Sequence, residues 1–105
     1  MSKPPKRFSD FLKKHPEVGA AYNGLSNATM TAGPLDKRTA QLVKLGIAIG
    51  MRHEGAVHAH ARKALDAGCS PDELRHVAIL GTTTHGFPNM MAAYSWITDI
   101  VDEQT

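Results

Sequence analysis

The sequence predicts an all-α fold of about five to six helices, and three observations support this expectation. Apolar residues recur at helical spacing through most of the chain. Proline, serine and glycine stand where helices begin and end. No segment shows the alternation of apolar and polar residues that is typical of strands. We therefore expect one helical domain over residues 1–105, with residues 1–7 as a loose arm.

Two helices are expected before the first strong chain break. The first runs from about Phe8 to Lys14. The second runs from Pro16 to about Met30, because proline suits the first helical turn, where its missing N–H would have no partner within the helix. The sequence Ala-Gly-Pro at residues 32–34 then interrupts the helix.

The next helix is the most apolar segment of the chain. Asp36 can cap it, and it runs to about Met51. Its apolar residues cover almost the whole circumference: Leu42, Val43, Leu45, Ile47, Ala48 and Ile49. A helix that is apolar all round is expected to be buried all round. Since a chain this short buries only about two thirds of its unfolded surface, the pattern predicts a homo-oligomer with this helix at a subunit interface.

Three further helices are expected in the C-terminal half. The first spans about His53 to Ala67 and stops at Gly68, a residue type that favours the position after a helix. The sequence Ser-Pro-Asp-Glu at residues 70–73 is a capping box with proline at the first helical position, and this helix ends near Thr83. A turn at residues 85–88 leads into the last helix, from about Pro88 to Asp102.

Composition excludes several classes of function. The formal net charge is only +2, without the dense basic stripe of a nucleic-acid binder, so we expect no nucleic-acid partner. No apolar run is long enough to cross a membrane, and no apolar segment of a signal peptide follows the first basic residues, so a cytoplasmic location is expected. The single cysteine, Cys69, rules out a CxxC motif and any disulfide within the chain.

Three of the six histidines lie between His53 and His60. On a helix, His53 and His60 share one face, and Glu54 with His58 forms a pair four residues apart on a different face. The segment resembles the HExxH of zinc proteases, but its second histidine comes one residue late to share a metal. We therefore assign no metal and expect no cofactor. A metal held by His53, His60 and a ligand from elsewhere stays an alternative.

Histidines are suited to acid–base chemistry because their pKa lies near neutrality. His53 and His60 are candidates because imidazoles on a closely packed helix need partners. Glu54 and His58 could orient a ring, or form an exposed stabilising pair. His85 precedes a turn at a helix N-terminus, where a side chain and backbone N–H groups can face a carboxylate; the alternative is a turn histidine without a role.

The order of these segments resembles the carboxymuconolactone decarboxylase family, which includes the AhpD-like alkylhydroperoxidases. The resemblance covers about residues 33–101 and rests on four segments. These are the helix sequence that begins GPLDKRTAQLVKLGIA, His60 followed by ALDAG, the SPDEL helix start, and the Gly-Phe-Pro turn at residues 86–88. The resemblance implies an AhpD-like fold and a homo-trimer or homo-hexamer, with the pocket where subunits meet.

The resemblance also indicates what is missing. The peroxidase members carry CxxCxxxH and a proton-relaying glutamate, and these positions hold His53, Ala56, His60 and Gln41 here. A peroxide needs a thiolate nucleophile, which neither histidine nor alanine supplies. We therefore expect no dithiol peroxidase activity.

The branch of the family without cysteines implies a lyase- or isomerase-like enzyme acting on a small carboxylated or lactone substrate. His60 would be the central acid–base group, supported by His53, His85, Glu54 and His58. Substrate contacts are expected from four further residues, of which Arg52 is a candidate partner for a carboxylate: Gln41, Arg52, Phe87 and Tyr94. The alternatives are a non-catalytic oligomeric ligand-binding relative and a relative that binds metal through its histidine cluster.

Overall fold

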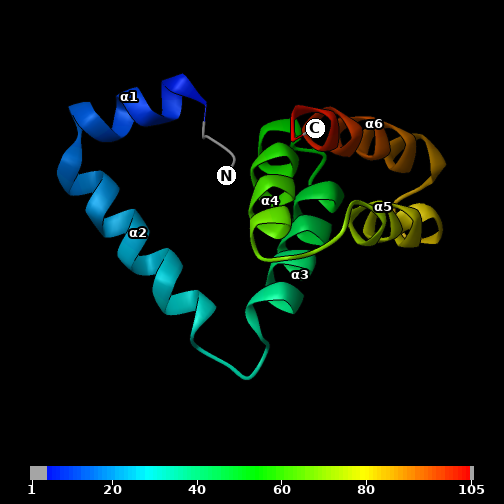
Figure 1. Ribbon diagram of the computed structural model, residues 1–105, viewed down its shortest axis with the longest axis horizontal. Coiled ribbons are helices and arrows are strands. Elements are labelled where there is room, and N and C mark those ends of the chain that lie inside the picture. The colour runs from blue at the N-terminus through cyan, green and yellow to red at the C-terminus, as the bar shows by residue number, and fades with distance from the viewer. Residues whose placement is uncertain (1–4, 105) are drawn as a thin grey trace. The chain divides into compact units, whose positions relative to one another are not determined.

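The computed structural model describes residues 5–104, and they are all-α (Figure 1). The elements are α1 (Lys6–Lys14), α2 (Pro16–Met30), α3 (Lys37–Gly50), α4 (Glu54–Asp66), α5 (Pro71–Leu80), a 3-10 turn η1 (Gly81–Thr83) and α6 (Phe87–Glu103). The chain divides into two units, one made of α1 and α2 and the other of α3 to α6. No helix in residues 5–104 is long and apolar enough to cross a bilayer.

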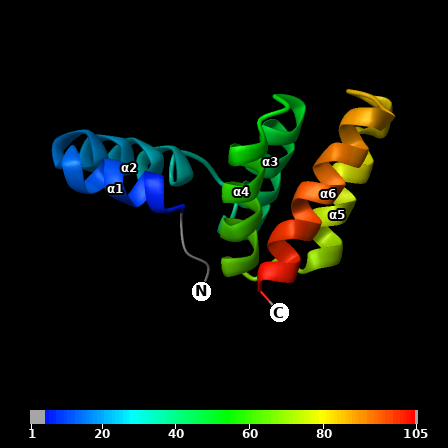
Figure 2. The same cartoon turned by 90° about the horizontal axis from the view of Figure 1, so that it is seen from above.

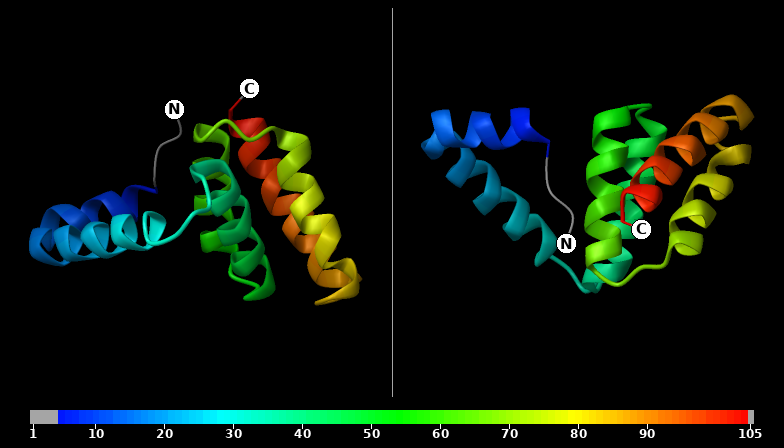
Figure 3. Two further views of the ribbon diagram at one scale, coloured as in Figure 1. Left: turned by 90° about the horizontal axis from the view of Figure 1, so that it is seen from below. Right: turned by 45° about the horizontal axis from the view of Figure 1, so that its top comes forward.

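The first unit is a pair of helices that buries almost nothing within itself. In the right panel of Figure 3, α1 and α2 meet at one end, where the chain turns at His15, and diverge from there. Gly19 is the only buried residue of the pair, and a Cβ there would lie 2.7 Å from Cδ2 of Leu12, so a larger residue would require the Leu12 side chain to shift. The large apolar side chains of the unit stay exposed: Phe8, Phe11, Val18, Tyr22 and Leu25.

The second unit contains the hydrophobic core. Helices α3 and α4 lie beside α5 and α6, and α6 packs against both α4 and α5 (Figure 2). The largest fully buried side chains come from all four helices: Leu45, Ile49, Val57, Leu74, Ile97 and Ile100. Fully buried alanines let the helix axes approach closely: Ala61, Ala64, Ala78 and Ala93.

Three of the local signals that predicted helix boundaries are confirmed. The Ser70 hydroxyl accepts a hydrogen bond from the backbone N–H of Glu73, and the Glu73 carboxylate accepts one from the N–H of Ser70. Gly68 follows α4 with a φ of +96°, which glycine adopts without strain. In α2, Pro16 stands in the first helical turn as predicted.

Two predictions are corrected. His53 is not in a helix: Arg52 has a φ of +58° and His53 is extended, so α4 begins at Glu54. In the single chain Val43 and Ile47 of the apolar helix are 47% and 57% exposed, so its burial all round stays a prediction that depends on a subunit interface. Of the predicted loose arm, residues 1–4 lie outside the described residues, and Lys6 already begins α1.

Candidate functional site

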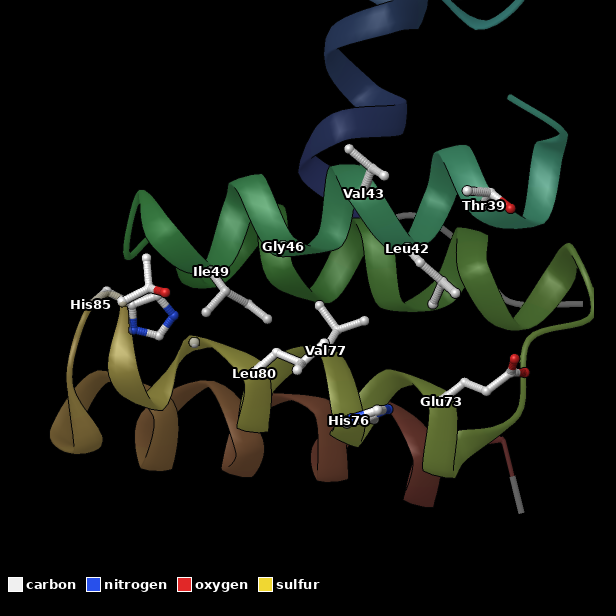
Figure 4. A pocket seen from close by; sticks show the side chains of 12 residues that line it. Thr39, Leu42, Val43, Gly46, Ile49, Glu73, His76, Val77, Leu80 and His85 are labelled. Carbon is white, nitrogen blue, oxygen red and sulfur yellow. The ribbon is translucent and has the colours of Figure 1, made fainter. Parts of the chain in front are cut away.

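A groove runs along the second unit between α3 and α5 and ends at η1 (Figure 4). Its volume is about 510 Å³. Five apolar side chains from α3 and α5 line it: Leu42, Val43, Ile49, Val77 and Leu80. Polar residues line it at Thr39, Glu73, His76, Thr84 and His85. An apolar cleft with a few convergent polar groups is the usual form of a small-molecule site.

His85 closes one end of the groove, and its orientation is fixed from behind by Asn89. The buried Asn89 side-chain nitrogen donates to the backbone carbonyl of Ile49 at 2.9 Å and lies 3.0 Å from Nδ1 of His85. The bond to the Ile49 carbonyl identifies this atom as the amide nitrogen and uses one of its two N–H groups. Nδ1 of His85 therefore accepts a hydrogen bond from the other N–H group. The proton of the neutral imidazole therefore resides on Nε2.

Gly81 leaves the space that this imidazole occupies. A Cβ built at Gly81 would collide with Nε2, Cε1 and Cδ2 of His85, so only glycine allows the ring to lie there. Gly81 itself lines the groove, which places Nε2 of His85 at the groove wall. The result is an N–H donor of fixed tautomer at the end of an apolar cleft.

The other end of the groove carries a carboxylate that is already engaged. Oε1 of Glu73 accepts from Nη2 of Arg38 at 2.7 Å and from the backbone N–H of Ser70 at 2.8 Å. The backbone hydrogen bond from Ser70, followed by the contacts with Arg38, lowers the pKa of Glu73. The Glu73 carboxylate therefore serves to cap the start of α5. His76, by contrast, is exposed and can contact a ligand.

His60 lies outside the residues that line the groove. It is half-buried on α4, and Nδ1 has no hydrogen-bond partner among the described residues. Burial lowers the pKa of His60 to about 4, with smaller contributions from the positive charges of Lys63 and Lys44. At neutral pH this side chain is a neutral imidazole.

His53 caps the N-terminus of α4. Its Nδ1 accepts a hydrogen bond from the backbone N–H of Ala56 at 3.0 Å, so the side chain caps α4. This removes the predicted stacking of His53 and His60 on one helical face, since His53 precedes the helix. Gly55 accommodates the ring, because a Cβ there would lie 3.3 Å from Cε1 of His53.

Glu54 and His58 form the predicted pair on α4, at 3.8 Å between Oε2 and Nε2. Asp99 from α6 joins them, with Oδ2 at 3.6 Å from the same Nε2. This cluster is separate from the groove lining. Of the five predicted acid–base residues, the structure thus brings Glu54 and His58 together and places His85 alone in the groove.

None of the four predicted substrate contacts lines the groove. Gln41 is buried within α3, and Arg52 forms the turn before α4. Phe87 is 59% exposed at the start of α6, and the half-buried Tyr94 packs against the core with the Arg75 guanidinium 5.9 Å from its ring centre.

Three residues with a part in these sites were missed by sequence reasoning. Asn89 and Gly81 each lie four residues from His85, and helical spacing could have connected them with it. Asp99 comes from another helix, and nothing in the sequence connects it with His58.

Comparison with known proteins places this architecture in a family. The profile of the carboxymuconolactone decarboxylase family matches residues 16–99. A carboxymuconolactone decarboxylase family protein from Legionella pneumophila, solved in its apo form, is similar over 94% of this chain and 88% of its own, with a TM-score of 0.79 at 21% identity. The likeness to that structure concerns the fold.

A curated relative is also similar. An uncharacterized protein of Haemophilus influenzae is 35% identical over 59 residues, which cover 56% of this chain and 52% of the relative. The matched segment thus spans about half the length of that relative. The family resemblance predicted from the helix sequences and the Gly-Phe-Pro turn is confirmed: the chain belongs to the carboxymuconolactone decarboxylase family.

Proposed function

We propose that the chain performs acid–base chemistry of the lyase or isomerase type on a small carboxylated or lactone substrate bound in the groove between α3 and α5. The observation that supports this is the hydrogen-bond chain from the Ile49 carbonyl through Asn89 to His85. It holds an N–H donor in one tautomer before a substrate arrives. A donor fixed in this way stabilises developing charge without reorganisation.

The reaction type follows from what such a donor can do. When a carboxylate leaves a lactone as CO2, its bonding electron pair stays on the substrate and spreads towards the lactone carbonyl oxygen. Nε2–H of His85 can donate to that oxygen, and a proton then reaches carbon to complete the exchange of CO2 for hydrogen. The apolar walls, among them Leu42 and Val77, keep water from weakening the contact.

The proposal gives the acid role to His85, whereas the resemblance gives the central role to His60. A neutral imidazole with a pKa near 4 is a weak base, and it lies outside the groove lining. That His60 is the central group stays a prediction, which variants of the two histidines can distinguish.

Peroxidase chemistry has no support in the residues present. The thiol of Cys69 is buried and lies 3.7 Å from the carbonyl oxygen of Arg38. A buried thiol of this kind is inert, and no second cysteine exists to form the disulfide of a dithiol cycle.

The test is turnover of a panel of carboxylated lactones by wild type, His85→Gln and His60→Gln, with His15→Gln as the control. We expect His85→Gln to lower kcat/KM by about 10²- to 10⁴-fold, the usual contribution of a positioned acid. The control should retain wild-type activity. If His60→Gln loses lactone turnover while His85→Gln keeps full activity, His60 and not His85 is the acid.

Asn89→Leu tests the positioning step separately. Nitrogen NMR of wild type should show the proton of His85 on Nε2, and the variant should show a mixture of tautomers together with a lower kcat. If the lactones bind in the groove but wild type turns none of them over, the proposal is wrong and the family member is a non-catalytic ligand-binding protein.

We also propose that the chain assembles into a homo-trimer or homo-hexamer. Large apolar side chains of the second unit remain exposed in the single chain: Val43, Ile47, Leu80, Phe87 and Met91. Val43 and Leu80 also line the groove, and large apolar side chains exposed on one subunit are typical of surfaces that a second subunit covers. Light scattering tests this, and a monomer at micromolar concentration contradicts it.

A further inference from the structure

Three potential metal ligands converge where α4 passes α6. One donor atom each of Glu54, His58 and Asp99 lies within 4.8 Å of the other two. Glu54 and His58 are one helical turn apart on α4, and Asp99 reaches them from α6. We propose that these three residues bind a divalent transition-metal ion, with Zn²⁺ as the best fit, and that the ion links α4 to α6.

The ring nitrogen of His58 is the first support for this proposal. Nε2 is inaccessible to solvent and has no hydrogen-bond partner among the described residues, although the side chain as a whole is 22% exposed. Both carboxylate oxygens lie beyond hydrogen-bonding distance, at 3.8 Å for Glu54 and 3.6 Å for Asp99. Buried polar atoms without a partner are uncommon, and an absent ion is one of the recognised explanations.

The spacing of the donors is the second support. Ligand atoms about 2.0–2.2 Å from a tetrahedral Zn²⁺ lie roughly 3.3–3.5 Å from one another. Nε2 of His58 lies 3.8 and 3.6 Å from the two carboxylate oxygens, which exceeds this value by only a few tenths of an ångström, and all three donor atoms lie within 4.8 Å of one another. Glu54 and Asp99 are 56% and 62% exposed, so rotation of either carboxylate can close the difference.

The local charge is the third support. An imidazole must be neutral to bind a metal, so this donor set supplies two negative charges from its carboxylates, which a divalent cation neutralises. Arg62, one helical turn from His58 on α4, donates to both carboxylate oxygens of Glu103 at 3.0 and 3.1 Å, so its charge is paired with that carboxylate.

The donor set also selects among metals. Mg²⁺ and Ca²⁺ favour sites built from oxygen alone, whereas imidazole nitrogen suits Zn²⁺ and its transition-metal neighbours. Three protein ligands leave the fourth tetrahedral position to water. The site uses neither His53 nor His60, the pair from which the sequence alternative would have built a metal site.

The experiment is calorimetric titration of Zn²⁺ into full-length, tag-free protein that has been treated with a chelator and dialysed. We expect one equivalent to bind to wild type and the Tm to rise with Zn²⁺ concentration, because an ion that binds only the folded chain stabilises it. His58→Gln should abolish the binding, and Asp99→Asn should weaken it by at least tenfold. Asp99→Asn alters an exposed side chain, so its fold is expected to survive, and circular dichroism checks this.

The matched controls are His15→Gln and Glu17→Gln, which change an exposed histidine and an exposed carboxylate in the other unit. Both should bind Zn²⁺ as wild type does. A Co²⁺ titration gives a second readout, since Asp99 lies one helical turn from Trp96, the only tryptophan, and bound Co²⁺ should quench its fluorescence.

Equal binding by wild type and His58→Gln, or no stoichiometric binding by wild type, would overturn the proposal. Mg²⁺ binding as tight as Zn²⁺ binding would also contradict it, because the imidazole would then have no part. Loss of lactone turnover in His85→Gln does not bear on any of these outcomes.

Discussion

Protonation of His60 should weaken the fold in mildly acidic solution. The side chain is half-buried and lies near the positive charges of Lys63 and Lys44. Its pKa falls from 6.5 in the unfolded chain to about 4 in the folded chain. The unfolded chain therefore binds the proton first, and stability is lost as the pH falls from about 6.5 towards 4. Above this window His60 is neutral in both the folded and the unfolded chain, so its titration does not reduce the free energy of unfolding.

The magnitude follows from the size of the shift. Between pH 7 and pH 5 only the part of the shift between 6.5 and 5 is crossed, which corresponds to about 2 kcal/mol at about 1.4 kcal/mol for each pKa unit. Because the imidazole is half exposed, solvent screening reduces our expectation to about 1 kcal/mol. Glu73 and Glu103 also have lowered pKa values, from backbone and arginine hydrogen bonds respectively, but their stabilisation is lost only below their usual 4.5.

The assay is urea unfolding of wild type and His60→Gln at pH 7, 6 and 5. The free energy of unfolding of wild type should fall by about 1 kcal/mol more than that of the variant over this range. High salt should reduce the part of the difference that comes from the lysines and leave the part that comes from burial. Parallel pH profiles for the two proteins would refute this reasoning, and His76→Gln, which alters an exposed histidine, controls for removal of any imidazole.

Two further predictions concern single contacts. Gly81→Ala should displace the His85 ring from its place and destabilise the chain by about 1–3 kcal/mol in urea unfolding, since overpacking costs this much; Gly50→Ala, where a Cβ meets nothing within 4 Å, should be neutral or stabilising, and equal effects would contradict the reasoning. Ser70→Ala removes one half of the capping box of α5 and should lower the unfolding free energy by about 1 kcal/mol, whereas an unchanged urea midpoint would show that the cap is redundant.

The sequence predicted those features of the fold that depend on neighbours along the chain. The capping box at Ser70, proline at the start of α2 and the left-handed Gly68 are local signals, and each is confirmed. The start of α4 was wrong by one residue for a local reason as well. Histidine is not a favoured capping residue, so the helical pattern was extended through His53, although its side chain accepts the capping hydrogen bond.

The candidate site was less predictable because it depends on contacts between helices. The prediction that His53 and His60 share one helical face assumed that both are helical, but His53 is extended and precedes α4. The bond from Asn89 to the Ile49 carbonyl and the approach of Asp99 to His58 join residues 40 or more positions apart, and the groove joins two helices, α3 and α5, that are separated by α4 in the sequence. No spacing within one helix contains that information.

The relation between Gly81 and His85 restricts how this chain can evolve. A side chain at position 81 and an imidazole at position 85 cannot occupy the same space, so the two positions cannot change independently. A lineage that replaces Gly81 must move the imidazole out of the groove wall or lose it, whereas a lineage that loses His85 can fill position 81. Among relatives that keep the imidazole in this place, position 81 should therefore be glycine, whereas relatives without the histidine can carry glycine or a larger residue there.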